Sequence, residues 1–186
     1  MRIVAGTWRG QALVAPVGMG TRPTSDRVRQ AVFDMLMHAG WAGRAAVDGV
    51  QVLDGFAGTG ALGLEALSRG ASGAVFMERD RTALAALRAN ITGCRAEALC
   101  RVLAVDVVAP PPGVSCGLVF LDPPYGQGLV AHAVAALDVA GWLAPAALVV
   151  AETGRAEELA LPGEKLAERA HGAALVTFWR IQNKAL

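Results

Sequence analysis

From residue 50 onward, short apolar segments alternate with longer segments of helical pattern, and no other feature constrains the fold as strongly. The expected strands cover residues 50–54, 74–78, 99–104, 118–122 and 147–152. The expected helices between them cover residues 61–69, 80–92 and 127–140. Such alternation is typical of α/β proteins, in which helices cover both faces of a parallel sheet. No helix follows the last apolar segment, 173–181, so we expect it to pair antiparallel with a strand near 164–169.

The first part of the chain has a different pattern. Residues 2–14 alternate weakly around a Trp-Arg-Gly turn, which predicts a small β-hairpin. A loop over residues 21–26 ends in helix-capping residues and leads into an amphipathic helix. The expected apolar face of this helix consists of Val28, Ala31, Val32, Met35 and Leu36. Since 186 residues fit one domain with a small extension, we expect a hairpin extension over residues 1–20 and a single α/β domain over residues 21–186.

Composition excludes several protein classes. With 54% hydrophobic and 18% charged residues, the chain is neither a disordered tail nor a coiled coil. The three cysteines form no CxxC pair and the three histidines are scattered, so we expect no metal site, no disulfide framework and a cytoplasmic location. Arg9 interrupts the N-terminal apolar stretch, which argues against a signal peptide. Gly141 and Pro145 divide the apolar window 133–151, which therefore predicts a helix and a strand rather than a membrane span.

A glycine-rich turn joins the first strand of this α/β region to the next helix. Gly58, Gly60 and Gly63 spell GxGxxG, and glycines allow a tight turn and a close approach of the backbone to a ligand. Glu78 lies twenty residues beyond Gly58 at the end of the next strand, where a carboxylate accepts hydrogen bonds from ribose hydroxyls. Strand, turn, helix and acid together predict a site for a nucleoside cofactor.

Two cofactor classes fit this turn, the NAD-like dinucleotides and S-adenosylmethionine. Asp54 ends the strand immediately before Gly55, where a carboxylate would repel a pyrophosphate but attract the ammonium of a methionine moiety. This favours S-adenosylmethionine, with Asp106 at the third strand end placed to accept from the adenine amino group. The cofactor-binding residues we expect are Asp54, Gly55, Phe56, Gly58, Gly60, Glu78, Arg79 and Asp106.

The segment Asp122-Pro123-Pro124-Tyr125 follows the fourth strand. The prolines remove two hydrogen-bond donors and stiffen the turn, so a backbone carbonyl and the Asp122 carboxylate can point at one spot. Two converging acceptors suit an NH2 group, and Tyr125 offers a face on which a planar base can stack. These four residues are the expected catalytic site, in which Asp122 orients an amine near the methyl donor and can take its proton. Methylation of a pyrimidine carbon would instead need a nucleophilic cysteine, and no cysteine lies in a suitable loop.

Positive charge is concentrated at the N-terminal end of the chain. Residues 1–30 hold five arginines and one acid, whereas acids outnumber bases in the remainder, which predicts a polyanionic partner on one face. Arg27 and Arg29 fall in the first turns of a helix, where its dipole disfavours cations. They either pair with Asp26 or Asp34 or contact phosphates. The expected RNA contacts are Arg2, Arg9, Arg22, Arg27 and Arg29.

Three segments, residues 22–29, 56–70 and 122–125, carry a family resemblance in this order. From Arg2 to Trp179 the chain resembles the bacterial small-subunit ribosomal RNA guanine-N2 methyltransferases, the RsmD family. The resemblance implies a Rossmann-like class I methyltransferase fold with a mostly parallel seven-stranded sheet. It also implies that S-adenosylmethionine donates a methyl group to the exocyclic N2 amine of one guanine in 16S ribosomal RNA, within the small ribosomal subunit. We expect a monomer, because no sequence feature calls for an obligate oligomer.

Three alternative functions remain at this stage. Related tetrads serve the N6 amine of adenine and the side-chain amide of protein glutamine, although those relatives often carry Asn where this chain has Asp122. An NAD-dependent oxidoreductase would share the glycine turn, but Asp54 and the tetrad argue against it. A non-catalytic RNA-binding module would not need the full set of acids and Tyr125 at the strand ends.

Overall fold

A seven-stranded sheet with the order β3-β2-β1-β4-β5-β7-β6 forms the centre of the molecule. The computed structural model describes residues 1–16 and 25–182. The strands are β1 (Gln51–Gly55), β2 (Gly73–Met77), β3 (Cys100–Leu103), β4 (Cys116–Leu121), β5 (Leu143–Gly154), β6 (Gly163–His171) and β7 (Ala174–Ile181). Strands β1 to β5 are parallel, and β7 pairs antiparallel with both β5 and β6. The α/β fold class and the antiparallel finish are confirmed.

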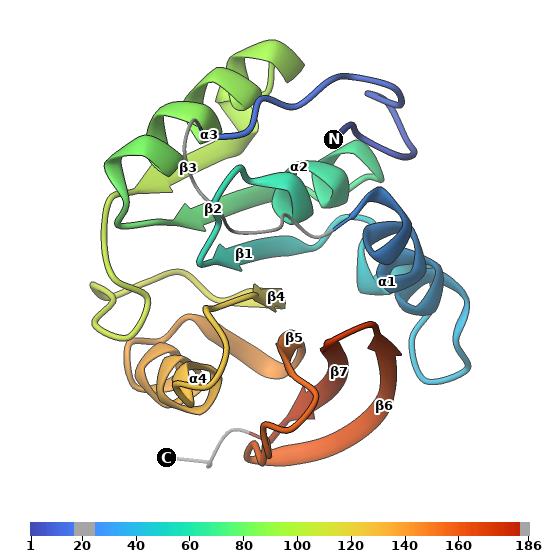
Figure 1. Cartoon of the computed structure of the whole chain (residues 1–186), viewed down its shortest axis with the longest axis vertical. Helices are drawn as coiled ribbons and strands as arrows, with labels where there is room; N and C mark the ends of the chain where they lie inside the picture. The colour runs from blue at the N-terminus through green and yellow to red at the C-terminus, as the bar shows by residue number, and fades with distance from the viewer. Residues whose placement is uncertain (17–24, 183–186) are drawn as a thin grey trace.

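Helices cover both faces of the sheet, as expected from the alternation (Figure 1). They are α1 (Asp26–His38), α2 (Ala61–Ser68), α3 (Arg81–Cys94) and α4 (Leu129–Val139), with short 3-10 turns η1 (Arg44–Ala46) and η2 (Glu97–Leu99). Apolar side chains of α1, α2 and α3 pack with alternate residues of the strands in one buried cluster. Those of α4 pack in a second cluster with the residues that point the other way, around the fully buried Trp142.

The window 133–151 divides into the end of α4 and most of β5, as the sequence predicts. Strand β5 begins at Leu143, earlier than expected, because Leu143 pairs with Cys116 before a bulge that contains Pro145. A proline lacks the N–H that a regular ladder needs, so a bulge accommodates it. Among the described helices, none has the length and apolar character that crossing a bilayer requires.

The N-terminal segment folds back on itself but does not form two ladder strands. A single antiparallel bridge joins Arg2 to Ala12, with hydrogen bonds of 2.9 Å from the Ile3 amide to the Gln11 carbonyl and from the Gly10 amide to the Ile3 carbonyl. Ile3 and Leu13 are buried in the same apolar cluster as α1, α2 and α3. The segment lies beside α2, where the Thr7 amide donates to the Ser68 carbonyl over 2.8 Å (Figure 1). The expected domain boundary at residue 20 falls outside the described residues.

Candidate active site

The carboxyl ends of β1, β2, β4 and β5 meet at one edge of the sheet. The register places Gly55 beside Met77 and Leu121, and Leu121 beside Ala151, so the residues that follow these strands lie in a row. An acidic residue lies at or near each of these strand ends. The four are Asp54, Glu78, Asp122 and Glu152, and a fifth acid, Asp106, comes after β3. Ligands of open α/β sheets bind outside such strand ends. The described structure therefore brings together the acids that the sequence predicted to share one site.

The glycine turn between β1 and α2 is open on one side and tightly packed on the other. Gly58 and Gly60 have positive φ values of 54° and 75°. A Cβ at Gly58 would have no side chain within 4 Å, which leaves that face of the turn accessible. A Cβ at Gly63 would lie 2.4 Å from the Phe76 ring, so this glycine is needed for the packing of α2 on β2. The first glycine of the motif thus offers backbone to a ligand, whereas the third has a structural role.

Glu78 ties the glycine turn to the end of β2. One of its carboxylate oxygens accepts from the Gly58 amide at 2.8 Å. The other accepts from the amides of Arg79 and Asp80, also at 2.8 Å. A carboxylate has about four acceptor positions, so three backbone bonds leave capacity for a ligand hydroxyl. Glu78 is therefore held rigidly beside the turn.

Asp54 lies beneath the turn and is almost completely buried, with 3% of its surface exposed. Its Oδ2 atom accepts from the Gly63 amide in the first turn of α2 at 2.9 Å. The pKa of Asp54 is raised to about 8, mainly by burial; the Gly63 hydrogen bond lowers it, and the negative charges of Asp122 and Glu78 contribute to the rise. Without a cation nearby, this carboxyl is therefore mostly protonated at neutral pH.

Arg79 has a partner that the sequence did not indicate. Its guanidinium pairs with Asp106 at 2.5 Å, and Asp106 also accepts from the Val108 amide at 3.2 Å. The Arg79 side chain is 73% exposed, and ion pairs at such positions contribute little to stability. The pair orients the Asp106 carboxylate at the outer end of the row.

The tetrad follows β4 and leaves the aromatic ring accessible. Asp122 is half-buried, Pro123 is buried, Pro124 is exposed and the Tyr125 side chain is 43% exposed. The Tyr125 hydroxyl donates to a carboxylate oxygen of Glu152 at the end of β5. Burial raises the pKa of the Tyr125 phenol, and the charges of Glu152 and Asp122 act in the same direction, so the phenol stays neutral.

A small pocket lies at this strand end, between the sheet and the helices α1 and α2. Its lining consists of Val32, Leu62, Leu121, Asp122, Val150, Glu152 and Val176. Two carboxylates thus face a space that is otherwise apolar. No role for Glu152 was predicted from the sequence. Its contact with Tyr125 crosses 27 residues of chain, and no local pattern predicts that contact.

The loop after the tetrad is held from a distance by Glu157. Its two carboxylate oxygens accept from the amides of Gly126 and Gly128, at 2.9 and 3.2 Å. A shallow depression beside Tyr125 is lined by this loop and by the end of β5, including Arg155. Glu157 is a second residue that the sequence did not single out, and it fixes the position of the turn that carries the tetrad.

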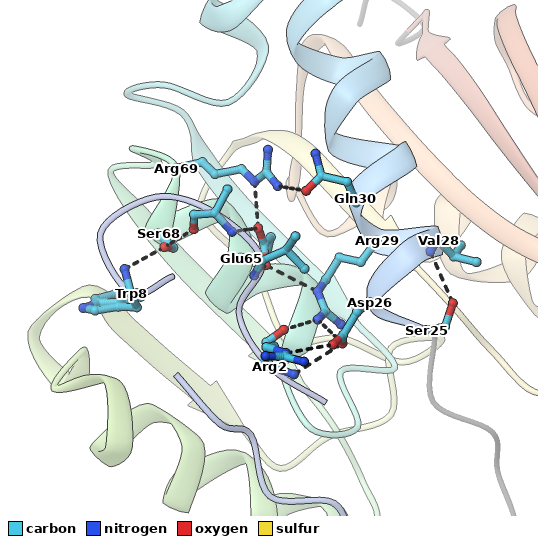
Figure 2. A network of polar contacts seen from close by, with 12 residues as sticks. Arg2, Trp8, Ser25, Asp26, Val28, Arg29, Gln30, Glu65, Ser68 and Arg69 are labelled. Atoms are coloured by element: carbon cyan, nitrogen blue, oxygen red, sulfur yellow. Dashed lines mark hydrogen bonds and ion pairs between the residues drawn. The ribbon is translucent and has the colours of Figure 1, made fainter. Parts of the chain in front are cut away.

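The N-terminal arginines divide into buried and exposed side chains. Arg29 is fully buried and pairs with Asp26 at 2.8 Å and with Glu65 at 3.4 Å (Figure 2). A buried guanidinium cannot reach a phosphate, so the expected RNA contact at Arg29 is wrong. The alternative that the sequence left open, an ion pair between Arg29 and Asp26, is the one observed. Arg9 and Arg27 are exposed, as is Arg2, whose guanidinium lies 3.8 Å from Asp26. Arg22 lies outside the described residues.

Glu65 on α2 connects the N-terminal segment to the body of the protein (Figure 2). It is fully buried and accepts from the amides of Val4 and Ala5, at 2.7 and 3.0 Å. It also pairs with Arg29 and with Arg69, the latter at 2.8 Å. Sequence reasoning missed Glu65, although one acid within an otherwise apolar helical stretch is a detectable signal.

Metal ligation finds no support in the described ranges, where no group of three His, Cys, Asp or Glu side chains is placed to hold an ion. The cysteines Cys94 and Cys116 are buried and Cys100 is partly buried, and all three are free thiols. Burial raises the pKa of each of these thiols, to about 12 for Cys100 and Cys116. None of the three is therefore an activated nucleophile.

Comparison with known proteins gives consistent matches over the whole chain. The family model "Conserved hypothetical protein 95" matches residues 1–180. The "Ribosomal RNA small subunit methyltransferase D" of Escherichia coli (strain K12) is 41% identical over 155 residues, which cover 82% of this chain and 74% of that protein. The protein of the same name from Haemophilus influenzae is 34% identical over 188 residues, which cover 98% of this chain and 94% of that protein.

Solved structures show the same similarity. The structure described as "Putative methyltransferase yhhF from Escherichia coli" has a TM-score of 0.84 and 34% identity, with 99% of each chain covered. An RNA methyltransferase from Salinibacter ruber, solved in complex with S-adenosyl-L-homocysteine, has a TM-score of 0.65 and 18% identity, with 89% of this chain and 97% of that one covered. At that identity the likeness extends to the fold alone. The fold is therefore that of the class I methyltransferases.

Proposed function

The chain belongs to the family described as Conserved hypothetical protein 95, and from this membership we propose that it methylates the exocyclic N2 amine of a guanine in 16S ribosomal RNA, with S-adenosylmethionine as methyl donor. Two relatives that bear the name of a small-subunit ribosomal RNA methyltransferase are 34% or more identical to the chain and cover most of it. The observation that carries the proposal is the tetrad Asp122 to Tyr125 beside the pocket at the end of β4.

The chemistry of the donor set fits S-adenosylmethionine better than a dinucleotide. Asp54 lies near the end of β1, and Glu78 and Asp106 come after the neighbouring strands β2 and β3. The cation assigned to the site, Arg79, is already paired with Asp106. The Glu78 carboxylate would repel a pyrophosphate, whereas the ammonium of a methionine moiety would favour the ionised form of Asp54 and be attracted to it. We propose that Glu78 accepts from the ribose hydroxyls, Asp106 from the adenine amine, and the region of Gly55 to Gly60 borders the methionine moiety.

The tetrad would position the amine for reaction. When bound, the cofactor would supply the methyl group of its sulfonium and, once that S–C bond is broken, would be left as a neutral thioether. Asp122 and a backbone carbonyl of the proline turn accept hydrogen bonds from the two N–H groups of the amine. These two bonds draw the nitrogen toward tetrahedral geometry and fix the direction of its lone pair. Asp122 can take the proton that the nitrogen loses after the new N–C bond has formed. Tyr125 stacks on the base, which has left its own stack to reach the pocket.

RNA contacts are proposed at exposed arginines near the N-terminus. Arg2, Arg9 and Arg27 have exposed side chains, and by sequence Arg22 belongs to the same basic stretch. Cations on one face neutralise phosphates and fix the register of an RNA without reading its sequence. We propose further that the chain acts as a monomer in the cytoplasm, on RNA that is part of the small ribosomal subunit.

Transfer of a labelled methyl group tests the proposed function. The protein is incubated with S-adenosylmethionine that carries a labelled methyl group and with either naked 16S ribosomal RNA or small subunits that lack the modification, and the labelled base is then mapped. The expected result is label on N2 of one guanine, which the Asp122→Ala variant does not produce. Label on an adenine, on a protein, or on no molecule would contradict the proposal.

A further inference from the structure

Glu152 is the second carboxylate, beside Asp122, at the strand end where the reaction is proposed to occur. Strands β4 and β5 are parallel neighbours with Leu121 beside Ala151, so the residues that come next, Asp122 and Glu152, lie side by side near the carboxyl ends of these strands. Adjacent strands lie about 4.8 Å apart, which lets two carboxylates reach neighbouring donors on one planar edge. Phe120 and Val150, two residues earlier in each strand, share one apolar cluster, so both carboxylates lie on the face covered by α1 and α2.

The chemistry of the purine bases distinguishes what such a pair can bind. The Watson–Crick edge of guanine presents the N1–H and N2–H2 donors next to each other. Adenine presents an acceptor at N1 and carries no amine at C2. A carboxylate facing N1 therefore forms a charge-assisted hydrogen bond with guanine, whereas it faces a lone pair in adenine. Enzymes that extrude a base read it by hydrogen bonds to this edge.

We propose that Glu152 is a specificity-determining residue that accepts the N1–H of the target guanine while Asp122 holds the N2 amine. This inference rests on the proposed function, because it concerns the base that enters the same pocket. The apolar side chains of Val32, Leu62 and Val176 line the small pocket beside the two carboxylates, and a less polar environment strengthens a hydrogen bond to the correct base. The same environment increases the cost of placing the Glu152 carboxylate against the N1 lone pair of a wrong base.

Tyr125 connects stacking with this reading of the base. Its hydroxyl donates to Glu152, so the ring over which the base stacks and the carboxylate that reads the base are fixed to each other. A carboxylate offers about four acceptor positions and can therefore accept from the phenol and from a base at once. A purely structural role for Glu152, as an anchor of Tyr125, makes a different prediction from the proposed one, because an anchor does not distinguish one base from another.

The test replaces the target guanine by 2-aminopurine, which keeps the C2 amine and has an acceptor instead of a donor at N1. Small-subunit RNA with either base at the mapped position is ligated, and single-turnover methylation rates are measured with wild-type protein and with Glu152→Gln. Wild-type protein should favour guanine by about ten- to hundredfold, the ratio that one charge-assisted hydrogen bond provides. In Glu152→Gln the amide can donate to N1 of 2-aminopurine, so the preference should fall by about threefold or more.

The ratio of equilibrium affinities for the two RNAs, measured with S-adenosylhomocysteine present, gives the same comparison if the variant is too slow to assay. Tyr125→Phe is the matched control, since it removes the hydroxyl bond to Glu152 and should change both rates by the same factor. A preference in Glu152→Gln within about twofold of wild type, in rate and in affinity, overturns the inference. An equal change of preference in Tyr125→Phe also overturns it, because Glu152 would then act through the tyrosine. If wild-type protein labels no guanine, the proposed function itself fails, which is a distinct outcome.

Discussion

Replacement of Glu65 by alanine should be among the most destabilising single changes in this protein. The carboxylate is fully buried and accepts four hydrogen bonds or ion pairs, from the Val4 and Ala5 amides and from Arg29 and Arg69. Alanine removes all four at once. It leaves two guanidinium groups whose side chains are at most 7% exposed with one partner fewer, and two backbone amides without an acceptor.

The expected loss follows from this geometry. Removal of one partner from a buried ion pair costs about 3–5 kcal/mol, because the remaining charge stays desolvated. Residual partners soften the effect, since Arg29 still meets Asp26 at 2.8 Å and Arg69 still reaches Gln30 at 3.1 Å. We therefore expect a loss of about 3 kcal/mol, a large fraction of the 5–15 kcal/mol that is typical of a whole domain. The midpoint of thermal unfolding should fall by roughly 6–12 °C.

Urea unfolding of wild type, Glu65→Ala and Glu65→Gln measures the free-energy difference, with Asp48→Ala as control. Asp48 pairs with Arg44 at 3.1 Å, but their side chains are 49% and 76% exposed, so its loss should cost less than about 1 kcal/mol. Glu65→Gln keeps an acceptor oxygen and should fall between wild type and alanine. Amide exchange at Val4 and Ala5 should accelerate in Glu65→Ala. If Glu65→Ala is no more destabilising than Asp48→Ala, the buried network does not hold the N-terminal segment and the reasoning is refuted.

Four further changes test the proposed site. Glu78→Ala removes a charged acceptor and should weaken S-adenosylmethionine binding by about tenfold or more in calorimetry, and unchanged affinity would show that Glu78 does not bind the ribose. The pKa of Asp54 rises from 3.8 unfolded to about 8 folded, so the folded state holds the extra proton and stability should fall as pH rises from 4 to 8. The slope should be at most about 1.4 kcal/mol per pH unit and should flatten in Asp54→Asn; an equal slope in both proteins contradicts the assignment. Asp122→Asn should keep appreciable single-turnover activity if orientation dominates, whereas a rate as low as that of Asp122→Ala would indicate proton acceptance. Combined Arg9→Ala and Arg27→Ala should flatten the salt dependence of RNA binding, and an unchanged slope would remove both from the interface.

The order of strands and helices could be predicted from the sequence because local patterns determine it. Apolar runs of five or six residues separated by amphipathic segments leave few alternatives to a parallel sheet with helices on both faces. Details that depend on the register between strands could not be predicted from the sequence. Strand β5 begins earlier than its apolar run suggests, because Leu143 pairs with Cys116 before the bulge that contains Pro145. The residues that follow the strands were located correctly, because strand ends and turn residues are visible in one dimension.

The partners of charged side chains could not be predicted, since they come from distant parts of the chain. Arg29 meets Glu65 across 36 residues, and Arg79 meets Asp106 across 27. Charge counting grouped Arg29 with the exposed Arg27, although residues two positions apart lie on opposite faces of a helix. The weak alternation of residues 2–14 predicted a hairpin. Several amides of this segment instead donate hydrogen bonds to the side chains of Glu65 and Ser68, where a hairpin would pair them with a second strand.

Helix α2 links the glycine turn to the N-terminal segment. Its eight residues span about 12 Å, from the glycine turn at one end to Ser68 at the other. The Gly63 amide holds Asp54 beneath the turn, and Glu65, less than one turn further, holds the N-terminal segment. The cofactor turn and the segment that carries Arg2 and Arg9 are therefore attached to one short rigid element rather than to separate loops. An RNA bound by those arginines would consequently be positioned relative to the methyl donor by the buried contacts of α2, among them those of Glu65.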